Sequence, residues 1–357
     1  MPGTSLPGVP KRNEKPDKIE YMVVPSAQPQ APFENVLTRL AHIEVPLLCG
    51  AMYPCSNPEL VAAVSEAGAL GIVQPLSLVY VHGYEFRSGL RYIRSLTSKP
   101  IGVNIIVEKT VKSYEDRMRR YLDIALEEGV RFFVTALGNP RWVVERVHQA
   151  GGLVFHDVTE RRWAERALAA EVDGFICVND RAGGHTGPLP IEQLYRELAD
   201  LGRPLVAAGG IGDAAGFRRA LEIGYIGVQM GTRFIATVEC KAHPDYKAAI
   251  CRATSADIVL TERLSGVPCS VIRTPTIERL GTKAGPLARW LLRGRKTKHW
   301  MRTFYALRSL RSLKRASLEG PSYRDVWQAG RSVDAIHEVV PARAVVDACR
   351  QVLLDLG

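Results

Sequence analysis

The residue of this sequence best suited to proton transfer is a histidine flanked by glycines. His185 lies in the run Ala182-Gly183-Gly184-His185-Thr186-Gly187. The flanking glycines let a planar ligand approach the backbone closely. An imidazole has an ordinary pKa of about 6.5, so it can accept a proton near neutral pH. The sequence therefore favours a catalytic role for His185 over a purely structural one.

Two further glycine-rich loops suit a phosphate group. One contains Gly209 and Gly210, the other contains Gly231 and Thr232, and each precedes a predicted helix. Small residues expose successive backbone N–H groups, and a helix N-terminus adds partial positive charge. The run from Gly210 also matches the G-x-G-x-x-G/A dinucleotide pattern, but it lies in the seventh βα unit rather than the first. The loops predict a phosphate site, with tight βα turns as the alternative.

Motifs of several other enzyme classes are absent from the sequence. It has no H-E-x-x-H, P-loop or G-x-S-x-G motif and no cluster of carboxylates. Metal, phosphoryl-transfer and serine-hydrolase chemistry therefore lack support. Seven cysteines without a C-x-x-C pair argue against a zinc site or a disulfide framework and suit a reducing cytosol.

The elements that must position these residues alternate regularly from Pro46 onward. The predicted strands are 46–50, 70–74, 101–105, 131–135, 153–156, 174–178, 204–208 and 226–230. Predicted helices include 57–67, 113–128, 159–170 and 213–223, with Asn57 and Asp213 as N-caps. Eight strands alternating with helices predict a (β/α)8 barrel, in which the loops after the strands form the site. An open doubly wound sheet would need fewer strands or a visible split into halves.

Three parts follow from composition. Residues 1–33 are rich in proline and predict a flexible arm, 34–275 contain the barrel, and 276–357 predict a helical, basic extension that packs on it. Residues 240–285 read as irregular, and the tail from 323 to 356 reads as two short helices. With neither a signal peptide nor a run of about 18 apolar residues, the protein is expected to be cytoplasmic and not transmembrane.

The net charge of +10 comes from one segment, because 289–315 hold ten basic residues and no acid. We predict an amphipathic helix there that packs as a lid or outer helix with a solvated basic face. An anionic ligand or surface is the alternative, either the phosphates of a nicotinamide or acyl-CoA substrate or an anionic membrane. Nucleic acid is disfavoured, since no binding fold or aromatic platform accompanies the charge.

The segments around these loops together resemble the nitronate monooxygenase family, formerly called 2-nitropropane dioxygenases. The matching stretches are 57–68, 102–104, 182–187, 207–211 and 227–234. The resemblance implies a TIM barrel that binds FMN and oxidises alkyl nitronates with O2 to a carbonyl compound and nitrite, with His185 as the catalytic residue. The cofactor-binding residues that it implies are Gly50, Ala51, Met52, Asn104, Asn179, Gly183, Gly184, Gly209, Gly210, Gly231 and Thr232.

Three features depart from the family pattern, and the first is the stretch Tyr53-Pro54-Cys55, which is bulkier than the loop expected after Met52. Val178 stands where relatives tend to carry a polar residue that touches flavin, so Asn179 is expected to replace it, and Asp157 stands where some relatives have a basic residue. The same scaffold also resembles flavin-dependent enoyl-thioester reductases and NAD(P)H:quinone reductases. A binding module without catalysis is the third possibility.

Overall fold

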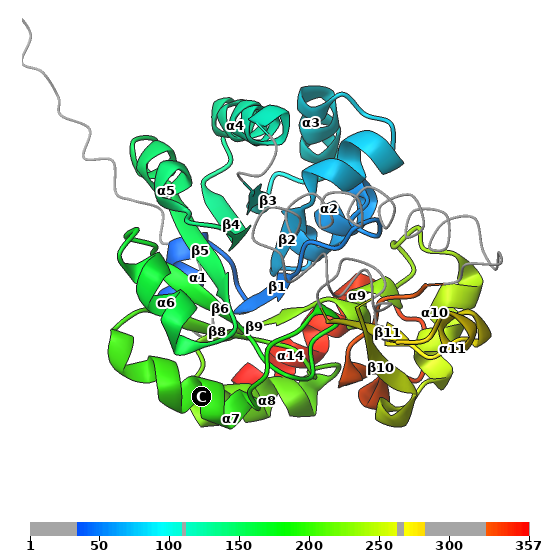
Figure 1. The fold of residues 1–357 in the computed structure, drawn as a ribbon. Coiled ribbons are helices and arrows are strands. Elements are labelled where there is room, and N and C mark those ends of the chain that lie inside the picture. Colours follow the sequence, from blue (N-terminus) through cyan, green and yellow to red (C-terminus); the bar gives the residue numbers. More distant parts are fainter. Residues whose placement is uncertain (1–33, 109–111, 263–267, 283–325, 357) are drawn as a thin grey trace, which may run out of the picture. The chain divides into compact units, whose positions relative to one another are not determined.

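Eight parallel strands close into a barrel in the order β1-β2-β3-β4-β5-β6-β8-β9 (Figure 1). The computed structural model describes residues 34–108, 112–262, 268–282 and 326–356, so the predicted arm 1–33 and the basic segment 289–315 lie outside the described residues. The strands are β1 (Leu47–Cys49), β2 (Leu70–Val73), β3 (Ile101–Val107), β4 (Phe132–Leu137), β5 (Leu153–Val158), β6 (Gly174–Val178), β8 (Leu205–Ala208) and β9 (Gly227–Met230). The predicted strands and the (β/α)8 fold are confirmed.

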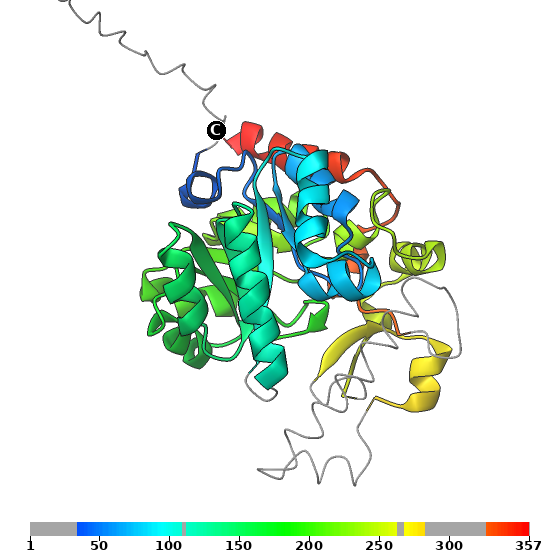
Figure 2. The ribbon, with the colours of Figure 1, turned by 90° about the horizontal axis from the view of Figure 1, so that it is seen from above.

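Helices follow the strands and cover the outside of the barrel (Figure 2). They are α2 (Pro58–Glu66), α3 (Phe86–Leu96), α4 (Lys112–Glu127), α5 (Arg141–His148), α6 (Arg161–Leu168), α7 (Ile191–Leu198), α8 (Ala214–Ile223) and α9 (Thr232–Ile235), with a π-turn η1 (Ser77–Val81) and a 3-10 turn η2 (Ala199–Leu201). Asp213 caps α8 as predicted, because its side chain accepts a hydrogen bond from the Gly216 N–H. Asn57 makes no such bond: its amide instead donates to the Glu239 carbonyl and accepts from the Lys241 N–H.

The barrel interior is filled by side chains from alternate strand positions. Leu48, Val134, Phe155 and Ile176 belong to one inner cluster. A short helix before the barrel, α1 (Val36–Ala41), adds Leu37 to the same cluster and so helps to fill the N-terminal end of the barrel. The opposite faces of the strands pack under the helices, so the strands are buried on both sides, as their continuous apolar runs require.

A second sheet was not predicted. β7 (Gly184–His185) pairs with β11 (Cys269–Ile272), which pairs with β10 (Ile258–Thr261), all antiparallel. Together with α10 (Pro244–Arg252), η3 (Ser255–Asp257) and α11 (Pro275–Leu280), these strands correct the reading of 240–285 as irregular. β7 has only two residues, and β10 and β11 lie outside the strand–helix alternation by which the barrel strands are recognised, so their pairing is decided by tertiary contacts.

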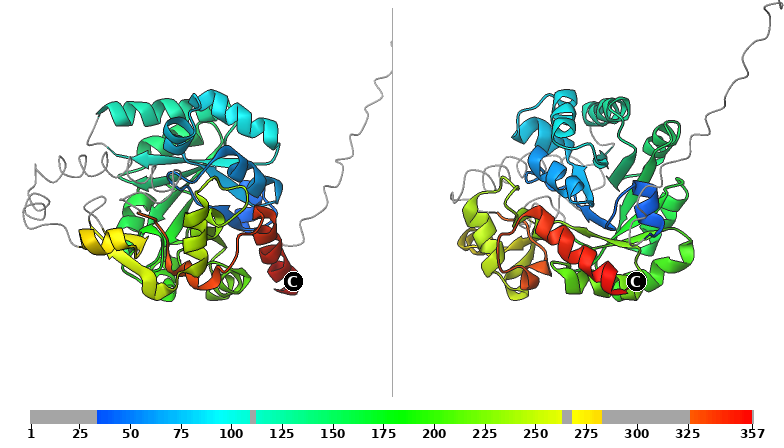
Figure 3. Two further views of the ribbon diagram at one scale, coloured as in Figure 1. Left: turned by 90° about the vertical axis from the view of Figure 1, so that its right-hand side faces the viewer. Right: turned by 180° about the vertical axis from the view of Figure 1, so that it is seen from behind.

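The C-terminal segment returns to the barrel. It contains a 3-10 turn η4 (Arg331–Ala335) and one 15-residue helix α14 (Ala342–Leu356), instead of the predicted two short helices. α14 packs against α2 and α8 through Val346, Cys349 and Leu353 (Figure 3). No helix within the described ranges is long and apolar enough to cross a membrane.

Candidate active site

His185 lies on the short strand β7, outside the barrel ring. Residue 185 pairs with Cys269 of β11, and Gly184, at φ +68°, pairs with Ser270. The left-handed backbone at residue 184 favours glycine, which explains one of the flanking glycines without reference to a ligand. His185 is exposed, and its backbone is fixed by the pairing of β7 with β11. His185 is therefore accessible to a substrate, as its predicted role requires.

Asn179 links the loops that follow β6 and β8. Its side-chain amide donates to the Gly209 carbonyl at 2.9 Å and accepts from the Arg181 N–H at 2.8 Å. Asn179 is fully buried, and a Cβ on Gly209, which has φ +113°, would lie 2.4 Å from its Oδ1. Asn179 therefore positions the Gly209 loop, and its contact with the flavin stays a prediction.

The segment before α14 completes the same group of loops, and the sequence did not reveal this. The Gly330 N–H donates to Thr232 Oγ1 at 3.0 Å, and the Arg331 N–H donates to the Arg181 carbonyl at 2.9 Å. A Cβ on Gly183 would lie 2.8 Å from the Gly330 nitrogen. A residue larger than glycine at 183 would therefore clash with the backbone at Gly330. In the sequence, the pair of small residues Ala329-Gly330 is compatible with this close contact but does not identify it.

Gly231, in the second predicted phosphate loop, stands where the described residues leave room for a side chain, and we call this the open position. Gly231 has φ −113°, which other residues can adopt, and among the described residues the nearest atom to a Cβ built there would be Met52 Sδ at 3.5 Å, an ordinary van der Waals distance. Gly210, at φ +73°, stands beside the Arg181 side chain. The helix that follows Gly231, α9, has four residues, so its dipole contributes little.

The predicted ring-binding residues after β1 lie next to this position. The Gly50 N–H donates to the Met230 carbonyl at 2.9 Å, and Met52 contacts the Gly231 position. A Cβ on Gly50 would lie 3.0 Å from Gln229 Cγ, so Gly50 leaves room for the Gln229 side chain. Gln229 was not predicted as a site residue, and its Oε1 is buried without a hydrogen-bond partner.

Asn104 and Asp157 are polar residues of the inner barrel wall. The Asn104 amide donates to the Val134 carbonyl at 3.2 Å, which fixes its orientation. The Asp157 Oδ1 is buried without a partner, and burial raises the pKa of this carboxyl to about 7. Unpaired buried oxygens at 157 and 229, together with the open position at Gly231, fit a polar ligand with a phosphate group, as a flavin mononucleotide is.

His156, the neighbour of Asp157, faces the outer side of β5 and serves stability. Its Nδ1 shares a 2.8 Å hydrogen bond with Thr135 Oγ1, and burial lowers its pKa to about 4. The unfolded chain therefore binds a proton at this residue that the folded chain does not. The contribution of neutral His156 to the unfolding free energy is complete above about pH 6.5. It falls by about 3 kcal/mol in all as the pH drops through about 4.

We expect His156→Gln to remove this acid sensitivity. Gln can keep a hydrogen bond to Thr135 but does not titrate. From about pH 7 to about pH 5 the unfolding free energy of the variant should shift relative to the wild type by about 2 kcal/mol in the variant's favour. Urea unfolding of both proteins at the two pH values measures this shift, and a constant difference between them would contradict the assignment.

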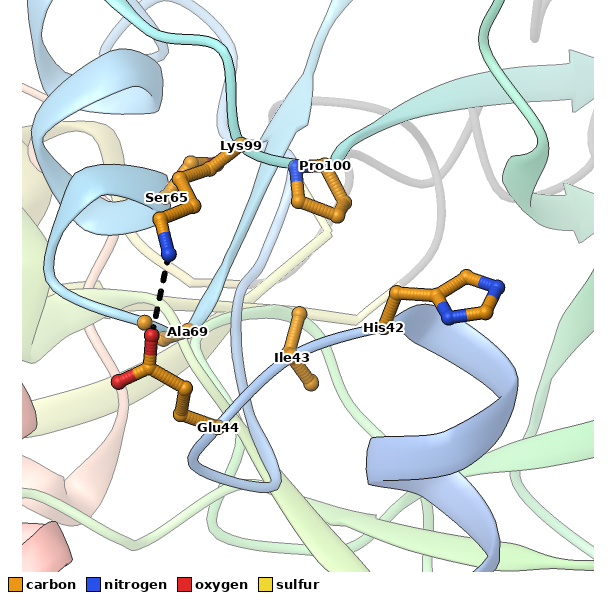
Figure 4. Close-up of a pocket in the computed structure, with 8 residues that line it drawn as sticks. His42, Ile43, Glu44, Ser65, Ala69, Lys99 and Pro100 are labelled. Carbon is orange, nitrogen blue, oxygen red and sulfur yellow. Dashed lines mark hydrogen bonds and ion pairs between the residues drawn. The ribbon is translucent and has the colours of Figure 1, made fainter. Parts of the chain in front are cut away.

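A small cavity lies at the opposite end of the barrel. Residues before β1, β2 and β3 line it, among them His42, Ser65 and Pro100, and Lys99 pairs with Glu44 across its edge (Figure 4). Its volume is about 20 Å³, room for about one water molecule. It is too small for an organic substrate.

Comparison with known proteins agrees with this arrangement. The family model described as nitronate monooxygenase matches residues 34–347. The chain is 32% identical over 248 residues, covering 68% of this chain and 67% of the relative, to (3aS,4S,5R,7aS)-5-hydroxy-7a-methyl-1-oxo-octahydro-1H-indene-4-carboxyl-CoA dehydrogenase of Mycobacterium tuberculosis. It is 32% identical over 272 residues to a nitronate monooxygenase of Pseudomonas aeruginosa, covering 64% of this chain and 77% of the relative.

A solved structure shows the same architecture over most of the chain. FabK from Thermotoga maritima superposes with a TM-score of 0.74 at 29% identity and covers 91% of this chain and 97% of its own. The barrel, its loops and these matches define a flavin-dependent oxidoreductase of the TIM-barrel type. The chain belongs to the nitronate monooxygenase family.

Proposed function

We propose that the protein is an FMN-dependent nitronate monooxygenase that acts in the cytoplasm, where its seven free thiols would stay reduced. It would oxidise an alkyl nitronate with O2 to a carbonyl compound and nitrite. The observation that carries the proposal is the open position at Gly231, bordered by Met52 and lying among the loops that the family resemblance assigns to FMN. When bound, the flavin supplies an electron acceptor that O2 can reoxidise.

The residues of this chain would divide the remaining tasks. The N–H groups around Gly210 and Gly231 would hold the phosphate, and Thr232 can donate its O–H because Gly330 uses only the oxygen. One side of the flavin ring would lie along Gly50, Ala51 and Met52. Exposed His185 would take a proton from the carbon next to the nitro group when the substrate is a neutral nitroalkane.

A second candidate is supported by one relative. The matched protein of Mycobacterium tuberculosis is named as a dehydrogenase of a carboxyl-CoA compound. A thioester, like a nitro group, makes the neighbouring C–H acidic, so the same histidine could move a proton there. The second candidate is therefore an FMN-dependent oxidoreductase of CoA thioesters, either as a dehydrogenase or as an NAD(P)H-using reductase.

Reductive half-reactions without O2 separate these functions. The full chain is first titrated with FMN, then mixed anaerobically with a secondary alkyl nitronate, with NADH or NADPH, or with a saturated acyl-CoA. We expect the nitronate to bleach the yellow flavin absorbance. Bleaching by NAD(P)H or acyl-CoA alone would assign the second candidate. A chain that takes up no FMN would overturn both and favour a binding module.

A further inference from the structure

Asp157 is a carboxylic acid on the inner wall of the barrel that the proposed function does not use. Phe155, two residues earlier on β5, belongs to the inner cluster and stacks on Phe132, with 5.1 Å between the ring centroids. Side chains of a strand alternate between its faces, so Asp157 shares the inner face and lies one layer nearer the C-terminal end. Its Oδ1 is buried there without a hydrogen-bond partner. Asp157 as a whole is half-buried, but leaving this one ionised oxygen out of water without a partner is costly, so a proton or a ligand would satisfy it.

No described charge beside Asp157 compensates it. His156 on the same strand is neutral because burial lowers its pKa to about 4, and the Cys177 thiol on β6 is neutral because burial raises its pKa. β4, on the other side, presents no titratable residue between 132 and 137. In the loop after β6, Arg181 is 3.2 Å from Asp334, with which it forms an ion pair. Burial alone accounts for the raised pKa of Asp157.

Gln229 presents a second unsatisfied oxygen on the same inner face. It stands opposite Leu48 in the register of β9 with β1, and Leu48 belongs to the inner cluster. Its Oε1 is buried without a partner, as is the Asp157 Oδ1. Both residues are the last but one of their strands, so they lie at the C-terminal end of the barrel. Gly231, with room for a side chain, follows β9 at the same end. Two unsatisfied polar groups in one barrel mouth indicate a ligand with several hydrogen-bonding atoms, and the pyrimidine edge of a flavin is such a ligand.

We propose that Asp157 contacts the flavin ring as a protonated carboxyl, donates its O–H to a ring acceptor, and retains or takes up a proton when the flavin is reduced. This inference rests on the proposed function, because it needs bound FMN. Reduction adds two electrons from the reducing substrate. One proton goes to the flavin, and where Asp157 is ionised a second goes to its carboxylate, since negative charge on the ring raises the proton affinity of a nearby acid.

The pH dependence of the flavin midpoint potential reports this proton. For a two-electron couple, each proton taken up contributes about 30 mV per pH unit. In the holoenzyme we expect a slope of about 30 mV per unit where Asp157 is protonated in the oxidised enzyme and about 60 mV per unit at higher pH, where it is ionised. The bend marks the pKa of Asp157 in the oxidised holoenzyme.

Asp157→Asn is the decisive variant. Its amide N–H can still donate to the ring, so FMN should be retained, but the residue cannot titrate and the potential should follow one slope of about 30 mV per unit throughout. Asp180→Asn is the matched control, because its Oδ1 is likewise buried and unpartnered, and it should keep the bend of the wild type. Equal profiles for wild type and Asp157→Asn would overturn the proposal.

Counting the protons that the wild-type holoenzyme takes up on reduction gives a second test, which does not depend on whether Asp157→Asn folds. Reducing the wild-type holoenzyme with dithionite in weakly buffered solution should consume one more proton per flavin at alkaline than at acid pH, after correction for the protons that dithionite releases on oxidation to bisulfite or sulfite at each pH. An unchanged count would overturn the role of Asp157 while leaving FMN binding intact. Failure of the chain to take up FMN at all would overturn the proposed function as well, so the two failures are distinguishable.

Discussion

Turnover of a neutral nitroalkane should fall by about 100- to 10,000-fold in His185→Asn, because the imidazole is the proposed base and general base catalysis contributes about that much. FMN should remain bound, since β7 is held to β11 through the backbone and no phosphate-loop residue is altered. The measurement is kcat/KM with the nitroalkane as substrate, combined with the flavin content of the purified variant.

Preformed nitronate provides the internal control for His185. A nitronate has already lost its proton, so His185→Asn should lose much less activity with it than with the nitroalkane. His337→Asn, at an exposed position before α14, is the matched histidine variant and should behave as the wild type. Equal losses with nitroalkane and nitronate would remove the assignment of His185 as the base.

Enlarging residue 231 should weaken cofactor binding while sparing the fold. The Cβ of Gly231→Ala or Gly231→Val enters space where the nearest atom is Met52 Sδ at 3.5 Å, and a methionine side chain can move. If the phosphate occupies this space, the variants lose charge-assisted hydrogen bonds worth about 2–3 kcal/mol each. We expect the Kd for FMN to rise about 100-fold or more in the valine variant and less in the alanine variant.

Gly183→Val is the contrasting variant for this second prediction. Its Cβ would meet the Gly330 nitrogen at 2.8 Å, so it should lose stability and FMN together. Circular dichroism and urea unfolding separate the two cases. The urea midpoint of Gly231→Val should lie close to that of the wild type, and the midpoint of Gly183→Val well below it. Wild-type FMN affinity in Gly231→Val would show that the phosphate does not lie at this position.

Much of the barrel could be predicted because its signals are local. Each buried parallel strand is a short apolar run, and each following helix has its own length and composition, so the eight strands follow from consecutive residues. The loops at the strand ends could be predicted for the same reason, which places His185, Gly209 and Gly231 at the C-terminal ends of the strands before any tertiary contact is known.

Residues that depend on distant contacts were misassigned or missed. The sequence did not show that Asn179 is buried and bonded to Gly209 and Arg181, so its part in positioning the Gly209 loop was missed. Gln229 lies within a recognised strand, but only the closed barrel shows that its oxygen is buried and unsatisfied. The small sheet around β7 was missed, since β7 has two residues and its partners lie outside the alternation of strands and helices that marks the barrel.

The sequence alone determined the class of fold and the order of the loops around the site, because hydrophobic periodicity and glycine spacing are properties of neighbouring residues. Only the tertiary structure decided that Gly330 packs on Gly183 and bonds to Thr232, that His185 is held by β11, and that the Asp157 Oδ1 is buried without a hydrogen-bond partner. Those contacts join segments far apart in the chain through backbone atoms and single side chains, for which no local pattern exists.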